Sequence, residues 1–135
     1  MPDELEQIRF TTRVLGPVAT YKLERRQVTQ TLRSGSEVIT DAIIRGQASP
    51  GDRLQIVLDG RSVGHVELLS MDAVSWGHLN LDDARRGGFN TLPELEAALR
   101  RAGFRFKLLN EYHLFRIQFV WLEEANRNAL QRPQG

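Results

Sequence analysis

The sequence predicts an α+β fold, a small and mainly antiparallel β-barrel with flanking short helices. Two extended segments with alternating apolar residues flank Asp59-Gly60, a pair that is typical of a β-hairpin turn. A helical pair follows, and its second helix begins with the capping box Thr91-x-x-Glu94. The chain then returns to extended segments rich in apolar and aromatic residues. This order of strands, helices and closing strands indicates a curved sheet or a small barrel.

The N-terminal part contains the less regular elements. Alternating apolar residues predict a first strand at 8–14. Pro17 suits the first turn of a helix, which predicts a short helix at 18–26. The candidate buried face of this helix consists of three residues: Val18, Tyr21 (or the aliphatic stem of Lys22) and Leu23.

The central part contains the predicted hairpin. Residues 27–33 form a strand, and Ser34-Gly35-Ser36 form a turn. Residues 37–45 fit either two short strands or one short helix, and both interpretations remain open. The two strands of the hairpin are residues 53–58 and 62–69, where apolar and polar residues alternate.

The C-terminal part contains the most regular helix. Residues 74–79 extend the sheet or connect it to a short helix at 82–86, which Gly87-Gly88 ends. The helix of the capping box carries Pro93 in its first turn and runs to Ala102. The remaining predicted segments are a strand at 104–109, a strand at 113–122 and a polar tail at 123–135.

Size and composition limit the classes of protein to which this chain can belong. We expect a single domain, residues 1–135, with its core at about 8–122, because 135 residues with 41% hydrophobic content can bury one core. The chain has no cysteine, which excludes disulfides, thiolate metal sites and cysteine nucleophiles. Its three histidines have no metal-ligand spacing, and we expect no metal and no cofactor. No apolar run reaches the roughly 20 residues that span a bilayer, and the acidic N-terminus lacks a signal-peptide pattern, so the expected location is cytoplasmic with no membrane contact.

Positive charge gathers in two islands although the net charge is only +1. Residues 9–33 contain six arginines and lysines against Glu24, and residues 85–107 contain another six against Glu94 and Glu96. The two islands could form one anion-binding face, or each could be ordinary solvated surface charge.

The segment 27–33 gives the sharpest prediction of a binding site. At the spacing of a strand, Thr29, Thr31 and Arg33 share one face and offer two hydroxyls and a guanidinium. Such groups suit a phosphate or the edge of a base. The alternative is a simple strand whose arginine pairs with a carboxylate such as Asp52. The other candidates are Arg26 and Arg86 at the rim, and Trp76 as the best stacking platform among Trp76, Tyr112 and Trp121, of which Trp121 is expected in the core.

Three motifs in this order resemble the ASCH domain, a family of the PUA-like superfamily. Thr29-x-Thr31-x-Arg33 is similar to the end of the family pattern Gly-x-Lys-x-x-(Thr/Glu)-x-Arg. Pro50-Gly51-Asp52 then precedes a strand, as in the family. The segment 83–89 is similar to a family turn, and Leu92-Pro93-Glu94-Leu95 follows it. The resemblance includes the closing strand 116–122 and spans roughly residues 8–122.

The resemblance implies a small β-barrel with a cleft beside the Gly-x-Lys pattern. It implies RNA or nucleotide binding, and some members act as amidohydrolases on acylated cytidine or as ribonucleases. The hydrolase type uses Lys, Thr and Glu. Counting back from Arg33 places the family Lys on Val28 and the family Gly on Arg26, while Thr31 keeps the Thr position. The Glu would lie near Gly87, and the nearest carboxylate is Asp83.

We therefore expect a module that binds RNA or a nucleotide-like ligand in a basic cleft. The alternative is a hydrolase of a modified nucleoside or a ribonuclease, with Thr31 as its catalytic residue. A third class is a protein-interaction domain. The oligomeric state stays open.

Overall fold

The computed structural model describes residues 6–105 and 113–122. Its centre is one five-stranded sheet in the order β1-β3-β4-β5-β2. β1 pairs with β3 in parallel, and the other three pairs are antiparallel. The strands are β1 (Gln7–Phe10), β2 (Gln30–Arg33), β3 (Arg53–Leu58), β4 (Arg61–Ser75) and β5 (His113–Trp121).

The sheet curls into a half-barrel whose two edge strands, β1 and β2, face each other. Register shifts interrupt the ladder between Ile56 and Val57 and between Leu68 and Ser70, and such bulges increase the bend and twist of a sheet. The Arg33 side chain on β2 reaches β1, where its Nη2 donates to the Arg9 carbonyl at 2.8 Å. We call the opening between β1 and β2 the seam.

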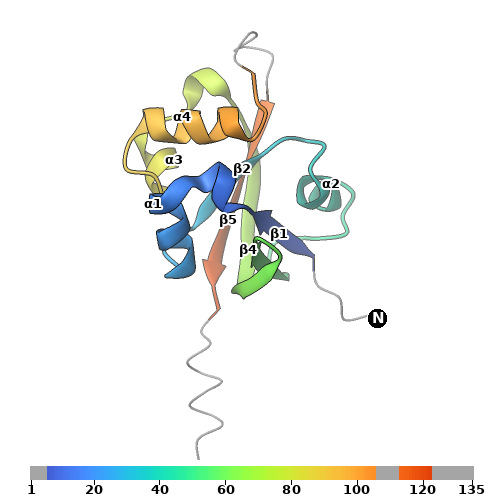
Figure 1. Ribbon diagram of the computed structural model, residues 1–135. Coiled ribbons are helices and arrows are strands. Elements are labelled where there is room, and N and C mark those ends of the chain that lie inside the picture. The colour runs from blue at the N-terminus through green and yellow to red at the C-terminus, as the bar shows by residue number, and fades with distance from the viewer. Residues whose placement is uncertain (1–5, 106–112, 123–135) are drawn as a thin grey trace, which may run out of the picture.

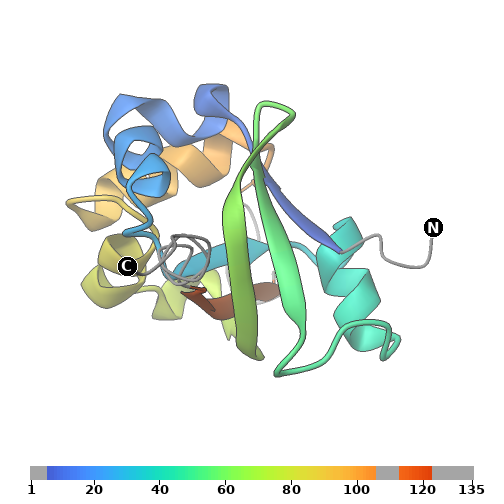
Figure 2. The ribbon, with the colours of Figure 1, turned by 90° about the horizontal axis from the view of Figure 1, so that it is seen from below.

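Helices cover the sheet on two sides. Three of them, α1, α3 and α4, form a layer on one side, and α2 lies on the other, as two perpendicular views show (Figure 1, Figure 2). Apolar residues of α1 and α4 enter the core together with the inner face of the sheet. The helices are α1 (Thr12–Glu24), α2 (Val38–Ile44), the 3-10 turn η1 (Trp76–His78), α3 (Leu81–Arg86) and α4 (Leu92–Arg101).

Two predictions from local signals are confirmed, and one open alternative is decided. Thr91 Oγ1 accepts from the Glu94 N–H, and the Glu94 carboxylate accepts from the Thr91 N–H, which completes the capping box. Asp59 and Gly60 have φ values of 50° and 84°, which is the left-handed pair of a type I′ hairpin turn. Residues 37–45 resolve as one helix, α2.

The predicted strand at 8–14 is too long. Only Gln7–Phe10 is extended, because Thr11 Oγ1 accepts from the Val14 N–H and caps α1. Gly16 has a φ of 80°, and this break lets the first turn meet the rest of α1 across a kink. The helix therefore begins six residues before the predicted position.

The predicted buried face of α1 is wrong in two of its three residues. Leu15, Ala19 and Leu23 are buried at a spacing of four. Val18 and Tyr21 lie on the other face, with 45% and 56% of their surface exposed. The first residue of the buried face, Leu15, precedes Pro17 and so lay outside the predicted helix.

Part of the predicted C-terminal structure lies outside the described residues. This holds for most of the predicted strand 104–109, for Tyr112 and for the polar tail 123–135. Within residues 6–105 and 113–122, no helix combines the length and the apolar character needed to cross a membrane.

Candidate functional site

A cavity of about 560 Å³ opens at the seam. Both edge strands line it, with Arg9 and Phe10 from β1 and residues 30–33 from β2. Apolar side chains of α4 and its neighbours form the interior, whereas Thr31, Arg33 and residues of the following loop form a polar rim. Cavities of roughly 300–1,000 Å³ that combine an apolar interior with a few polar groups are typical of small-molecule sites. We call this the seam cavity.

Arg33 is the most unusual charged group of the cavity. Its guanidinium lies over the Phe10 ring at 4.7 Å from the centroid, and one nitrogen donates to the Arg9 carbonyl. Its Nε is buried and has no hydrogen-bond partner. Burial lowers the pKa of Arg33 to about 10, although the negative charge of Glu37 opposes this shift. The cation is thus desolvated without a carboxylate in contact, and an anion in the cavity would relieve that cost.

The β2 backbone adds hydrogen-bonding groups to the same wall. The Phe119 N–H donates to the Thr29 carbonyl, which places Thr29, Thr31 and Arg33 in the pairs that bond to β5. The main-chain groups of Gln30 and Leu32 consequently point away from β5, toward the seam. The wall therefore offers peptide donors and acceptors beside the Thr31 hydroxyl and the Arg33 guanidinium.

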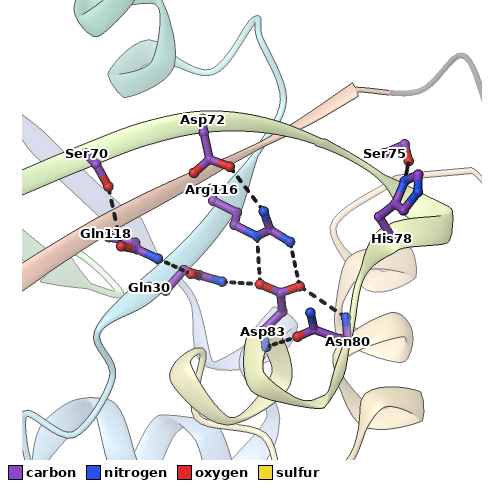
Figure 3. A network of polar contacts seen from close by, with 9 residues as sticks. All are labelled: Gln30, Ser70, Asp72, Ser75, His78, Asn80, Asp83, Arg116 and Gln118. Carbon is purple, nitrogen blue, oxygen red and sulfur yellow. Dashed lines mark hydrogen bonds and ion pairs between the residues drawn. The ribbon is translucent and has the colours of Figure 1, made fainter.

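A polar network includes Gln30 and Asp83, two buried residues that also line the cavity (Figure 3). Arg116 on β5 donates two hydrogen bonds to Asp83 on α3, at 2.7 and 3.0 Å. Gln30 Nε2 donates to the same carboxylate at 2.9 Å, and the Asn80 N–H donates at 3.1 Å. Asp83 belongs to a capping box at the start of α3, so the helix end holds the carboxylate in place.

The ionised carboxylate of Asp83 orients two amides in turn. Because a carboxylate only accepts, Gln30 must present its Nε2 to Asp83 and its Oε1 to Gln118. Gln118 then receives the Ser70 hydroxyl on its own Oε1. Burial raises the pKa of Asp83, but hydrogen bonds from Arg116, Gln30 and Asn80 outweigh it, and the net pKa lies below the usual value. With four donors on its two oxygens, Asp83 is a structural anchor of β2 and β5.

This lowered pKa predicts how stability depends on acid. A depressed carboxyl pKa contributes stability above the unfolded value of about 3.9, and the contribution disappears as pH falls through the folded value. We expect the difference in unfolding free energy between the wild type and Asp83→Asn to be constant above about pH 5 and to shrink as pH falls further. Urea titrations from pH 7 to pH 2.5 measure it. A difference that stays constant over this whole range would contradict the assignment.

The structure places the predicted site residues in three groups. Thr31 and Arg33 line the seam cavity. Thr29 is exposed outside it, and so is Arg86, which pairs with Asp82 at 2.8 Å. Arg26 donates to the Val63 carbonyl and lies over the Trp121 ring, also away from the cavity.

Trp76 does not fit its predicted role. It has 4% of its surface exposed and meets Phe104 edge to face at 6.5 Å between ring centroids. Its ring therefore has no open face for a base. The 3-10 turn buries it, whereas the Gly77-His78 sequence suggested a loop.

Sequence reasoning missed the network residues Gln30, Arg116 and Gln118. A signal was present: Arg116 and Gln118 alternate with apolar residues of the last strand, so one face of an otherwise apolar strand is polar. It also missed Phe10, whose ring lies under the Arg33 guanidinium. In the described part of the chain, no group of three or more histidines and carboxylates is placed to hold a metal ion.

Two solved structures share this architecture. An ASCH domain from Lactobacillus crispatus matches with a TM-score of 0.56 over 84% of this chain and 79% of its own, at 14% identity. The chain has an ASCH-like fold. A DUF984 protein from Enterococcus faecalis also matches with a TM-score of 0.56, over 89% of this chain and 82% of its own, at 13% identity. No family model and no curated protein matches the sequence.

The ASCH-like fold confirms the predicted architecture, and at this identity the likeness concerns the fold alone. Arg26, which stands where the pattern has glycine, has a φ of 62°, a conformation that glycine adopts most easily.

The two departures from the hydrolase pattern meet in space. Val28, at the Lys position, is 1% exposed. A Cβ added to Gly88, next to the expected Glu position, would lie 3.0 Å from the Val28 side chain. Hydrocarbon therefore fills the place where this pattern would put a lysine beside a glutamate.

Proposed function

We propose that the protein binds a nucleotide-like, anionic ligand in the seam cavity, as a free nucleotide or as part of RNA. The observation that supports this most is the buried, unpartnered Nε of Arg33 at the cavity wall. A hydrogen bond from a charged guanidinium to a phosphate contributes about 1.5–3 kcal/mol. The Thr31 hydroxyl stands on the same wall and can contact the same ligand.

The interior of the cavity suits a base. Phe10, Phe89 and Phe104 are among its lining residues, together with leucines of α4. Aromatic and aliphatic surfaces of this kind stack against or enclose a planar ring. A base inside and a phosphate at the Arg33 rim would use both halves of the cavity.

Binding is a better proposal than hydrolysis for the residues that are present. Val28 has no group that accepts a proton, and the Asp83 oxygens are occupied by four donors. General base catalysis needs a group with a pKa near the operating pH, and the pKa of Asp83 is shifted the other way. Among the described residues, the positions that correspond to the family Lys and Glu supply no base beside Thr31.

A comparison of nucleosides with their 5′-monophosphates tests the proposal. We expect isothermal titration of the wild type to show at least tenfold tighter binding of one or more monophosphates than of the matching nucleoside. In Arg33→Gln we expect this ratio to fall to about one, because the group that recognises the phosphate is gone; tenfold corresponds to about 1.4 kcal/mol.

The matched control is Arg45→Gln. Arg45 is the C-cap of α2, is exposed and pairs with Asp41, so this substitution removes one positive charge away from the cavity. The nucleotide preference should survive this change. Equal affinity of the wild type for nucleosides and monophosphates, or an unchanged ratio in Arg33→Gln with intact circular dichroism, would refute the assignment of Arg33.

A further inference from the structure

A stripe of three exposed side chains and one half-buried side chain, that of Lys22, runs along α1 on the face turned away from the core. It consists of Val18, Tyr21, Lys22 and Arg25, at the i, i+3, i+4, i+7 spacing of one helix face. Tyr21 exposes 56% of its surface, which is unusual for an aromatic residue on a helix that packs its other face into the core. We call this face the α1 stripe.

The α1 stripe is positive, and within residues 6–105 and 113–122 no carboxylate forms an ion pair with Lys22 or Arg25. The Arg25 guanidinium lies over the Tyr21 ring at 4.8 Å from the centroid, and the Lys22 ammonium donates to the Asn90 amide oxygen at 2.8 Å. Glu24, the acidic residue of this helix, pairs with Arg61 on β4. An exposed ring flanked by two such cations is the combination that binds single-stranded nucleic acid, where bases stack and phosphates pair with cations.

The α1 stripe adjoins the wall of the seam cavity. The turn between α3 and α4 contributes Gly87 and Phe89 to the cavity lining, while Asn90 at its end accepts from Lys22. Gly88 of the same turn packs against Ala19 of α1. One short turn therefore separates the two surfaces, which a strand of a few nucleotides can bridge.

We propose that the α1 stripe is a second contact surface for single-stranded RNA whose end nucleotide occupies the seam cavity. The inference rests on the proposed function and narrows its ligand to an oligonucleotide. One base stacks on the open face of Tyr21, opposite the Arg25 guanidinium, and neighbouring phosphates contact Lys22 and Arg25.

Anisotropy measurements with a labelled 12-nucleotide RNA and titrations with a nucleoside monophosphate separate the two surfaces. We expect Tyr21→Ala combined with Arg25→Gln to weaken 12-mer binding about tenfold or more and to leave monophosphate binding unchanged. Each lost phosphate contact should lower the slope of log K against log[salt] by about 0.7 for a single strand. Tyr21→Phe keeps the ring and should bind like the wild type, and so should Arg45→Gln, the charge control at the C-cap of α2.

The outcomes distinguish failure of the α1 stripe from failure of the seam cavity. If the Tyr21→Ala/Arg25→Gln variant binds the 12-mer with full affinity, the inference is overturned. The result for the monophosphate is then judged separately. A wild type that binds the monophosphate but not the 12-mer also overturns it. If the 12-mer binds through Tyr21 but no monophosphate binds, the α1 stripe is supported and the proposed nucleotide site in the seam cavity is refuted. If light scattering shows a dimer that Tyr21→Ala dissociates while RNA affinity is unchanged, the occupant is a second copy of the chain and the inference fails.

Discussion

Replacing Arg116 by leucine should lower the free energy of unfolding by about 3–5 kcal/mol, the usual cost of breaking a buried ion pair. The Asp83 side chain is 5% exposed and Arg116 supplies two of its four hydrogen bonds. Without Arg116 the carboxylate remains buried, with only Gln30 and the Asn80 N–H as donors. Urea unfolding of both proteins at pH 7, followed by circular dichroism, measures the difference.

The matched control is Asp72→Asn, because Asp72 is the exposed partner of the same guanidinium at 3.1 Å. Exposed ion pairs contribute about 0–1 kcal/mol, so this variant should stay close to the wild type. Asp83→Asn combined with Arg116→Gln should be less harmful than Arg116→Leu, because it leaves no unpaired buried charge. If Arg116→Leu and Asp72→Asn cost the same, the buried pair is not the anchor that its geometry indicates.

The elements that the sequence predicted correctly are those with local signals. The Asp59-Gly60 turn and the Thr91 capping box depend on residues within four positions of each other, and both form. The strand that contains Phe119 was equally clear from its apolar content. Local chemistry is enough to place such elements, and their order is enough to indicate an α+β sheet.

The seam cavity could not be predicted in the same way. Its walls come from β1, β2 and α4, which are far apart in the sequence, and the sheet that brings them together contains two register shifts. Arg33 was predicted as a ligand contact from its strand alternation, yet its position over Phe10 and its bond to Arg9 depend on the curl of the sheet. The ligand-binding roles of Arg33 and Thr31 stay predictions that the nucleotide titrations test.

The error on α1 has a different cause. The apolar residues Val18 and Tyr21 suggested a buried face, but Leu15, Ala19 and Leu23 are the buried residues, at a regular spacing of four. The predicted helix started after Pro17 and so left out Leu15, the first residue of this face. Burial of that face leaves Val18 and Tyr21 exposed in the α1 stripe.

Val28, which the resemblance aligns with the family Lys, contacts Gly88 of the turn between α3 and α4. Val28 packs under the α3–α4 turn, where Gly88 leaves just enough room for it. The turn also supplies Gly87 and Phe89 to the seam cavity. The tight contact of Val28 with Gly88 therefore lies in the same turn as the cavity-lining residues Gly87 and Phe89.

Gly88→Ala should consequently lower the free energy of unfolding by about 2–5 kcal/mol. Gly88 has a φ of +97°, and a side chain in the left-handed region costs roughly 1–2 kcal/mol. The new Cβ would also lie 3.0 Å from Val28 Cγ2 and 3.3 Å from the Ala19 Cβ, and overpacking of this kind costs about 1–3 kcal/mol. Urea unfolding measures the total, and the displaced turn should also weaken any nucleotide binding in the seam cavity.

Gly103→Ala separates the two contributions, because Gly103 has a similar φ of +104° but no atom within 4 Å of the added Cβ. We expect it to cost only the backbone part, about 1–2 kcal/mol. In a Val28→Ala background, Gly88→Ala should cost less than in the wild type, because the 3.0 Å contact with Val28 is removed, but more than Gly103→Ala, because the 3.3 Å contact with Ala19 remains. A double-mutant cycle then gives a coupling of about 1 kcal/mol. Additive effects of Val28→Ala and Gly88→Ala would mean that the turn relaxes around the added methyl, and that the Val28 contact does not fix the cavity wall.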